Sequence, residues 1–183
     1  MKRRLFLTGL MGCGKSTAIA NALGAGIGRC GGFLTKRVRD ANGNITGFSL
    51  ESPDGERRKI FLDFSGESPT IKPEVYEKLG VELLSGKVLV LDEIGGVEVL
   101  CPGFSQRLEE VLQSDVPILG VLKGEGPAGA LIEALGLSAR YQSAIAQLRR
   151  RIGSDPDTLL YECGKFDENA LILAQNWVKE YCP

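Results

Sequence analysis

Histidine is absent from this chain, and its five cysteines are odd in number with no pair spaced C-x-x-C. Without histidine or closely spaced cysteines, a zinc site is disfavoured, and so is a disulfide framework. The sequence therefore predicts reduced thiols and a cytoplasmic protein. The cysteines are Cys13, Cys30, Cys101, Cys163 and Cys182.

An excess of charge of either sign is also lacking. The chain has 22 Lys and Arg against 23 Asp and Glu, which leaves a net charge of −1. Such a balance argues against bulk electrostatic binding to nucleic acid or to an anionic membrane surface. No apolar run approaches the roughly 18 residues that a membrane-spanning helix needs. We expect neither membrane nor nucleic acid as a partner.

The most informative segment that is present runs from Gly9 to Ser16 and matches G-x-x-x-x-G-K-[ST], the phosphate-binding loop. A short apolar strand, residues 5–7, precedes it, and an alanine-rich helix over residues 17–23 follows and ends at Gly24. A strand, a glycine loop and a helix in this order form the context that the motif requires.

Each residue type in this loop has a distinct role in holding phosphate. Backbone N–H groups and the helix N-terminus attract the phosphate oxygens. Lys15 is expected to reach the β- and γ-phosphates, and Ser16 to hold Mg²⁺ through its hydroxyl. The predicted nucleotide-binding residues are Gly9, Gly12, Cys13, Gly14, Lys15, Ser16 and Thr17.

A second signature follows the continuous apolar run of residues 88–91, which is typical of a parallel strand buried on both faces. The run ends in Asp92 and Glu93. We expect Asp92 to hold Mg²⁺ and Glu93 to polarise the attacking water. Residues 92–95 also spell D-x-x-G, but no guanine-reading N-K-x-D follows. Guanine selectivity is therefore not supported.

Residues from about 30 to 63 differ in pattern from the rest. Alternating segments over 33–39, 45–50 and 59–62 are separated by turns at Asn42-Gly43 and at residues 53–55. This pattern predicts an antiparallel β meander inserted into a single domain that covers residues 1–183.

The remaining chain alternates helical and strand patterns, as α/β domains do. Residues 64–73 are expected to form a polar loop, and Asp167 to cap the last helix. Helices are predicted over 74–79, 104–112, 130–137, 143–151 and 167–181, and strands over 116–122 and 158–162.

Three blocks give the chain a resemblance to the nucleoside-triphosphatase family of the thermostable and cancer-related type. They are residues 9–17, residues 32–39 with Gly47-Phe48 downstream, and residues 92–98. The middle block is the most specific, because phosphate-loop proteins at large do not share it. Two departures are Val97, where the family has Met, and Ala170, where it has Arg.

The resemblance implies a RecA-like phosphate-loop fold, a three-layer α/β sandwich with a mostly parallel central sheet. It also implies Mg²⁺-dependent hydrolysis of several nucleoside triphosphates, ATP and GTP included. The family pattern keeps an arginine at Arg39. We expect Arg39, or its neighbour Arg37, to stabilise the transferring phosphoryl group, either in cis or from a neighbouring subunit.

Other charged residues and other functions stay open at this point. Glu98 can orient the metal shell or a loop backbone, Lys123 can contact the γ-phosphate or solvent, and residues 149–151 can form a lid or a solvated helix end. A nucleotide or nucleoside kinase is the first alternative function, since residues 64–73 and 149–151 would offer an acceptor pocket and a lid. A nucleotide-gated protein-binding module is the second.

Overall fold

The computed structural model describes residues 1–124, 126, 135–137, 139–165 and 167–182. The helix predicted over 130–137 lies largely outside the described residues. Within the described part of the chain, no helix is both long and apolar enough to cross a membrane.

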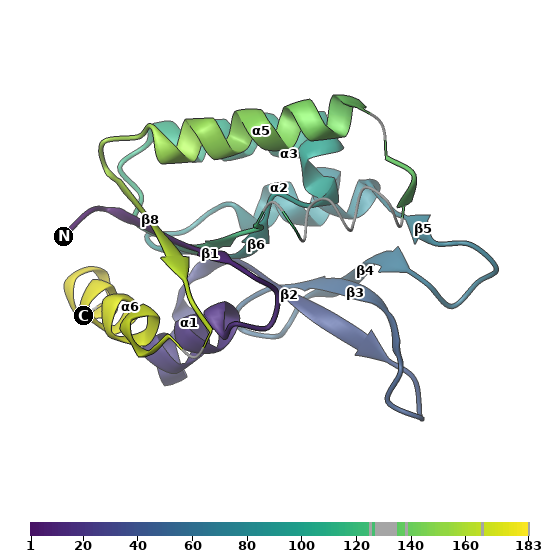
Figure 1. The fold of residues 1–183 in the computed structure, drawn as a ribbon, viewed down its shortest axis with the longest axis horizontal. Coiled ribbons are helices and arrows are strands. Elements are labelled where there is room, and N and C mark those ends of the chain that lie inside the picture. The colour runs from purple at the N-terminus through teal and green to yellow at the C-terminus, as the bar shows by residue number, and fades with distance from the viewer. Residues whose placement is uncertain (125, 127–134, 138, 166, 183) are drawn as a thin grey trace.

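An eight-stranded sheet organises the fold, in the order β5-β4-β3-β2-β6-β7-β1-β8 (Figure 1). The strands β2, β6, β7, β1 and β8 pair in parallel, and β2 to β5 pair antiparallel. The predicted mostly parallel sheet with an antiparallel part is thus confirmed. The strands are β1 (Arg4–Gly9), β2 (Gly31–Arg39), β3 (Ile45–Glu51), β4 (Arg58–Asp63), β5 (Thr70–Ile71), β6 (Leu89–Ile94), β7 (Ile118–Leu122) and β8 (Thr158–Cys163).

The meander is continuous with the central sheet, because β2 belongs to both parts. The first half of β2 pairs in parallel with β6, beginning at Gly31 opposite Leu89. The later residues of β2 pair antiparallel with β3. The polar loop predicted over 64–73 contains β5, which places Ile71 opposite Leu62 of β4. A two-residue strand is too short to show a period in the sequence.

Helices cover both faces of the sheet and complete the predicted three layers (Figure 1). One face carries α1 (Lys15–Leu23) and α6 (Glu168–Tyr181). The other carries a π-helical turn (Tyr76–Gly80), α2 (Val81–Leu83), α3 (Pro102–Gln113) and α5 (Ala139–Gly153). The side chain of Asp167 accepts a hydrogen bond from the Asn169 N–H, which confirms the predicted cap of α6.

The two hydrophobic cores lie on opposite faces of the sheet, as the alternation along β1 illustrates. Leu5 and Leu7 pack with α1 and α6, whereas Phe6 between them packs with α3. All three side chains are almost fully buried. Because each such side chain stabilises the fold by roughly 1.5–3 kcal/mol, the register of this strand is strongly specified.

The carboxyl ends of β1, β6 and β7 meet at one edge of the sheet. Leu7 of β1 and Asp92 of β6 both lie opposite Val121 of β7. The segments that follow these strands therefore emerge side by side. In open α/β sheets, this is the edge where ligands bind.

Candidate active site at the phosphate loop

The phosphate loop joins β1 directly to α1. Gly14, the N-cap of α1, has a φ of 99°, in the left-handed region that glycine adopts without strain. Because no acidic residue stands in the first turn of α1, its positive end is left to attract an anion.

The Lys15 side chain lies back over the loop. It is 7% exposed, and its ammonium donates hydrogen bonds to the carbonyl oxygens of Gly9 at 3.1 Å and Leu10 at 2.7 Å. It also lies 3.5 Å from the Cys13 sulfur. The loop carbonyls thus compensate a largely desolvated positive charge, which a bound phosphate would compensate more strongly.

Ser16 and Asp92 come together although they are 76 positions apart in the sequence. The Ser16 hydroxyl donates to Asp92 Oδ1 at 2.6 Å. Asp92 is 3% exposed, and this burial raises its pKa to about 6. The hydrogen bond from Ser16 has the opposite, smaller effect on this pKa. Two oxygen ligands that meet in this way form the donor set that Mg²⁺ prefers.

Glu93 forms an ion pair that crosses from β6 to the end of β7. Its Oε2 lies 2.9 Å from the Lys123 ammonium. The Lys123 backbone N–H donates to the carbonyl of Ile94 at 2.8 Å, and its own carbonyl accepts from Arg149 Nη1 at 2.5 Å. Lys123, whose role the sequence left open, therefore lies at the predicted site and holds the predicted base.

These residues line one cavity of about 450 Å³. Its walls are the loop residues 11–12 and 14–17, the carboxylates of Asp92 and Glu93, and Lys123. The meander adds a third wall made of Thr35, Lys36, Arg37 and Phe48. The volume is in the range of small-molecule and cofactor sites.

Arg39 lies away from this cavity. Its guanidinium donates to the Gly43 carbonyl in the β2–β3 turn at 2.5 Å. The β2–β3 register shifts between Val38 and Arg39, as at a β-bulge, with Thr46 of β3 as the extra residue. The structure brings Arg37 to the cavity and leaves Arg39 at the hairpin.

A family model for NTPases matches residues 4–150 of the chain. The chain belongs to this NTPase family. Its membership makes it a nucleoside-triphosphatase enzyme, as the strand, loop and carboxylate arrangement predicts.

Two archaeal relatives illustrate the degree of similarity in sequence. Nucleoside-triphosphatase THEP1 of Methanocaldococcus jannaschii is 32% identical over 133 residues, covering 65% of this chain and 77% of the relative. The THEP1 protein of Methanosarcina acetivorans is 32% identical over 132 residues, covering 65% and 75%.

Two solved structures resemble the NTPase over nearly its whole length. The crystal structure of THEP1 from Aquifex aeolicus has a TM-score of 0.68 at 18% identity and covers 98% of this chain and 99% of its own, which shows the shared fold. The solution structure of a human cancer-related nucleoside triphosphatase has a TM-score of 0.65 at 26% identity and covers 97% and 96%.

Glu98 of this NTPase is buried and serves the loop after β6. Its carboxylate accepts hydrogen bonds from the backbone N–H groups of Gly95 and Gly96, the latter at 2.9 and 3.0 Å. Burial raises the pKa of the Glu98 carboxyl group, whereas the hydrogen bonds from the backbone lower it. Glu98 therefore fixes the backbone that leads out of Asp92 and Glu93, and it does not line the phosphate-loop cavity.

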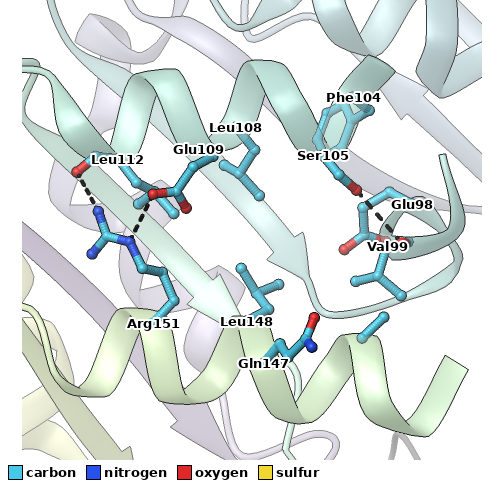
Figure 2. A pocket seen from close by; sticks show the side chains of 11 residues that line it. Glu98, Val99, Phe104, Ser105, Leu108, Glu109, Leu112, Gln147, Leu148 and Arg151 are labelled. Atoms are coloured by element: carbon cyan, nitrogen blue, oxygen red, sulfur yellow. Dashed lines mark hydrogen bonds and ion pairs between the residues drawn. The ribbon is translucent and has the colours of Figure 1, made fainter. Parts of the chain in front are cut away.

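A second cavity of about 440 Å³ lies between α3 and α5 (Figure 2). Leu108 of α3 and Leu148 of α5 point into it. Arg151 stands at one end, where its Nε lies 2.9 Å from Glu109 and its Nη2 donates to the Leu112 carbonyl at 3.2 Å. The arginines of the run 149–151 therefore have different partners: Arg149 contacts Lys123, and Arg151 links α5 to α3.

Among the residues of the phosphate-loop cavity that sequence reasoning missed are Thr35, Lys36 and Phe48. They belong to the block 32–39 and the Gly47-Phe48 pair that carry the family resemblance. That block was therefore a usable signal for a second wall of the site. Its side chains could not be assigned to the cavity without knowing that β2 pairs with β6.

Proposed function

We propose that this NTPase hydrolyses ATP, GTP and other nucleoside triphosphates with Mg²⁺, giving the nucleoside diphosphate and phosphate. One observation carries the proposal most directly. The Ser16 hydroxyl and the Asp92 carboxylate are 2.6 Å apart in a cavity that also contains Lys15 and Glu93.

Ser16 and Asp92 are the residues that would hold Mg²⁺. Their oxygens are hard ligands, and the buried Asp92 carboxylate has only the Ser16 hydroxyl as a hydrogen-bond partner among the described residues. A Mg²⁺ ion held there would supply positive charge to offset the charge that develops on the phosphate oxygens.

Lys15 would move from the loop carbonyls of Gly9 and Leu10 to the β- and γ-phosphates. The Gly9 and Leu10 carbonyl oxygens are neutral, and a charged phosphate oxygen makes a stronger hydrogen bond with the ammonium. The move requires the Lys15 side chain to rotate away from these carbonyls.

Glu93 would accept the proton of the attacking water. In the free protein, its carboxylate is held by the Lys123 ammonium. A γ-phosphate in the cavity would compete for that ammonium, so Lys123 would turn toward the phosphate and leave Glu93 free as a base. Hydrolysis would thus depend on a filled site.

A positive charge beside the transferring phosphoryl group would come from the meander. Lys36 and Arg37 line the cavity, and Lys36 also lowers the pKa of Asp92 by its charge, although burial of Asp92 has the larger, opposite effect. A role for Arg39 stays a prediction, and in cis it would require movement of the β2–β3 hairpin. A cytoplasmic location also stays a prediction, supported by the cysteine pattern.

The test is phosphate release from ATP, GTP, CTP and UTP, with Mg²⁺ or with EDTA, in the presence and absence of nucleoside and nucleotide acceptors. Glu93→Gln removes the base. Glu110→Gln makes the same chemical change at an exposed side chain of α3 that pairs with Arg107, and it serves as the matched control.

We expect acceptor-independent release that needs Mg²⁺, is lost in Glu93→Gln and is kept in Glu110→Gln. A phosphorylated acceptor with little free phosphate would instead support the kinase. Tight nucleotide binding without release or transfer would support the nucleotide-gated binding module.

A further inference from the structure

Four of the five cysteines meet in two pairs that the sequence spacing does not reveal. Cys13 lies close enough to Cys163 to raise the pKa of that thiol, and Cys182 likewise raises the pKa of Cys30. All five thiols are free. Both pairs belong to the core on the face of the sheet that α1 and α6 cover.

Strand β8 delivers Cys163 to the phosphate loop. It pairs in parallel with β1, so that Cys163 lies opposite Gly9, the first residue of the loop. The two backbones are so close that a Cβ on Gly9 would lie 2.6 Å from the Cys163 carbonyl oxygen. Cys163 is therefore held at the rigid end of the sheet, and Cys13 reaches it from the loop.

The two thiols of this pair differ in their surroundings. Cys13 is half-buried, and its sulfur lies 3.5 Å from the Lys15 ammonium, a position in which a cation favours attack by a thiol. Cys163 is buried, and this burial, with Cys13 beside it, raises the pKa of its thiol to about 12. Cys13 is thus the thiol that an oxidant meets first, and Cys163 is the one that resolves the adduct.

The loop in this structure turns its polar groups onto itself. The Cys13 N–H donates to the Leu10 carbonyl at 3.5 Å, and the Lys15 ammonium bonds the carbonyls of Gly9 and Leu10. Phosphate binding needs the loop N–H groups and this ammonium to face the ligand. A bond from Cys13 to the fixed strand β8 would hold the loop in its present form.

We propose that Cys13 and Cys163 form a reversible disulfide that closes the phosphate loop to nucleotide, so that binding requires the reduced pair. This rests on the proposed function only in that the loop must bind a nucleotide. It adds a covalent switch inside the binding loop itself.

The chemistry is thiol–disulfide exchange with a small-molecule disulfide. The Cys13 thiolate attacks one sulfur of that disulfide, and the first small thiolate leaves. The Cys163 sulfur then attacks Cys13 and expels the second small thiolate, which takes up the Cys163 proton. Two protein thiols are oxidised to one disulfide, and the small disulfide is reduced to two thiols.

The other cysteine pair offers an internal control. Cys30 precedes β2, and Cys182 follows α6. Neither lines the phosphate-loop cavity. Burial of Cys30 raises the pKa of its thiol to about 11, and the charge of Cys182 adds to this rise. Oxidation of this pair would join two chain segments without touching the loop.

The experiment treats the full chain with glutathione disulfide and then removes the reagent. Linked peptides are identified by mass spectrometry without reduction, and the Kd of a fluorescent ATP analogue is measured before oxidation, after it, and after dithiothreitol. The three proteins are the wild type, Cys163→Ala and Cys182→Ala. Thermal unfolding of the reduced proteins checks that each is folded.

We expect a Cys13–Cys163 link in the wild type and in Cys182→Ala. If fewer than a tenth of the oxidised molecules keep an open loop, the measured Kd rises about tenfold or more. Reduction with dithiothreitol should restore the Kd to its value before oxidation. Cys163→Ala forms no such link and can keep only a glutathione adduct on Cys13, so its Kd should rise less than that of the oxidised wild type.

Three results would overturn the proposal: no Cys13–Cys163 link, a linked wild type with unchanged Kd, or an equal loss of affinity in Cys163→Ala. The last would mean that an adduct on Cys13 alone blocks the loop. A reduced wild type that binds no nucleotide would refute the proposed function and the gating together. The linked peptides would then still report separately whether the pair forms.

Discussion

The phosphate-loop cavity and the cavity between α3 and α5 have nearly the same volume, about 450 and 440 Å³, but they are built differently. The first is assembled from segments that leave the carboxyl ends of β1, β6 and β7. The second lies between the facing sides of two helices (Figure 2). Similar size therefore does not imply similar use.

The charges in the two cavities show the difference most clearly. In the phosphate-loop cavity, Lys15 is held by loop carbonyls, and Lys123 is held by Glu93. Incoming phosphates would replace both arrangements. At the helix cavity, Arg151 and Glu109 hold α5 against α3, and the remaining wall is largely apolar. We expect substitutions in the first cavity to change activity and those in the second to change stability.

Lys15→Ala should have the largest effect on activity. It removes the positive charge that we assign to the β- and γ-phosphates, and loss of such a charge lowers phosphoryl-transfer rates by roughly 10³–10⁵-fold. We expect kcat/KM to fall on that scale, with weaker ATP binding and an unchanged urea midpoint. Steady-state phosphate release and equilibrium binding measure this. Native-like kcat/KM would remove Lys15 from the site.

Glu93→Gln should separate binding from hydrolysis. Loss of a general base lowers kcat by about 10²–10⁴-fold, while the amide keeps the shape of the side chain. The Kd for ATP should change little, because Glu93 is not assigned to the phosphates or to the metal. Single-turnover hydrolysis and ATP binding measure the two effects, with Glu110→Gln as control. Hydrolysis at the native rate would show that another group acts as the base.

Leu108→Ala should give the opposite result in the helix cavity. Leu108 is buried among the residues of the core beneath α3, and truncation of a buried Leu costs about 2–5 kcal/mol of unfolding free energy. Urea denaturation measures this loss, and ATP binding at low temperature should be unchanged. A loss of ATP affinity in the folded variant would couple the two cavities and break the comparison.

Arg37→Ala and Arg39→Ala test which arginine of β2 acts at the site. Arg37 lines the cavity, whereas Arg39 bonds the Gly43 carbonyl. We expect kcat to fall by about tenfold or more for Arg37→Ala, because loss of a preorganised electrostatic contact raises the barrier. Arg39→Ala should change kcat less than about twofold. The reverse order would support the role that the sequence pattern predicts for Arg39, through movement of the hairpin or from a neighbouring subunit.

Arg151→Ala should have the smallest effect. Its ion pair with Glu109 is partly exposed, and such pairs contribute about 0–1 kcal/mol. We expect a loss of unfolding free energy on that scale and no change in kcat. A large fall in kcat would revive the lid that a kinase requires, and product analysis with acceptors would then decide between the two functions.

Local segments of the sequence predicted much of the fold and part of the site. A phosphate loop is recognisable because its strand, glycines, lysine and helix are adjacent in the chain and each has a local physical reason. The same holds for the apolar run that ends in Asp92 and Glu93, and for Asp167 at the start of α6. These features depend on interactions within a few residues, so they can be predicted from a short stretch of sequence.

Contacts between distant segments required the tertiary structure. The register of the sheet sets Lys123 beside Glu93 and Cys163 beside the phosphate loop, whereas Arg39 bonds the Gly43 carbonyl in the β2–β3 turn. The order of amino acids shows that charged residues and cysteines are present, but not which of them meet. Pairing across the sheet decides this, because strand register and bulges position each side chain relative to partners far away in the chain.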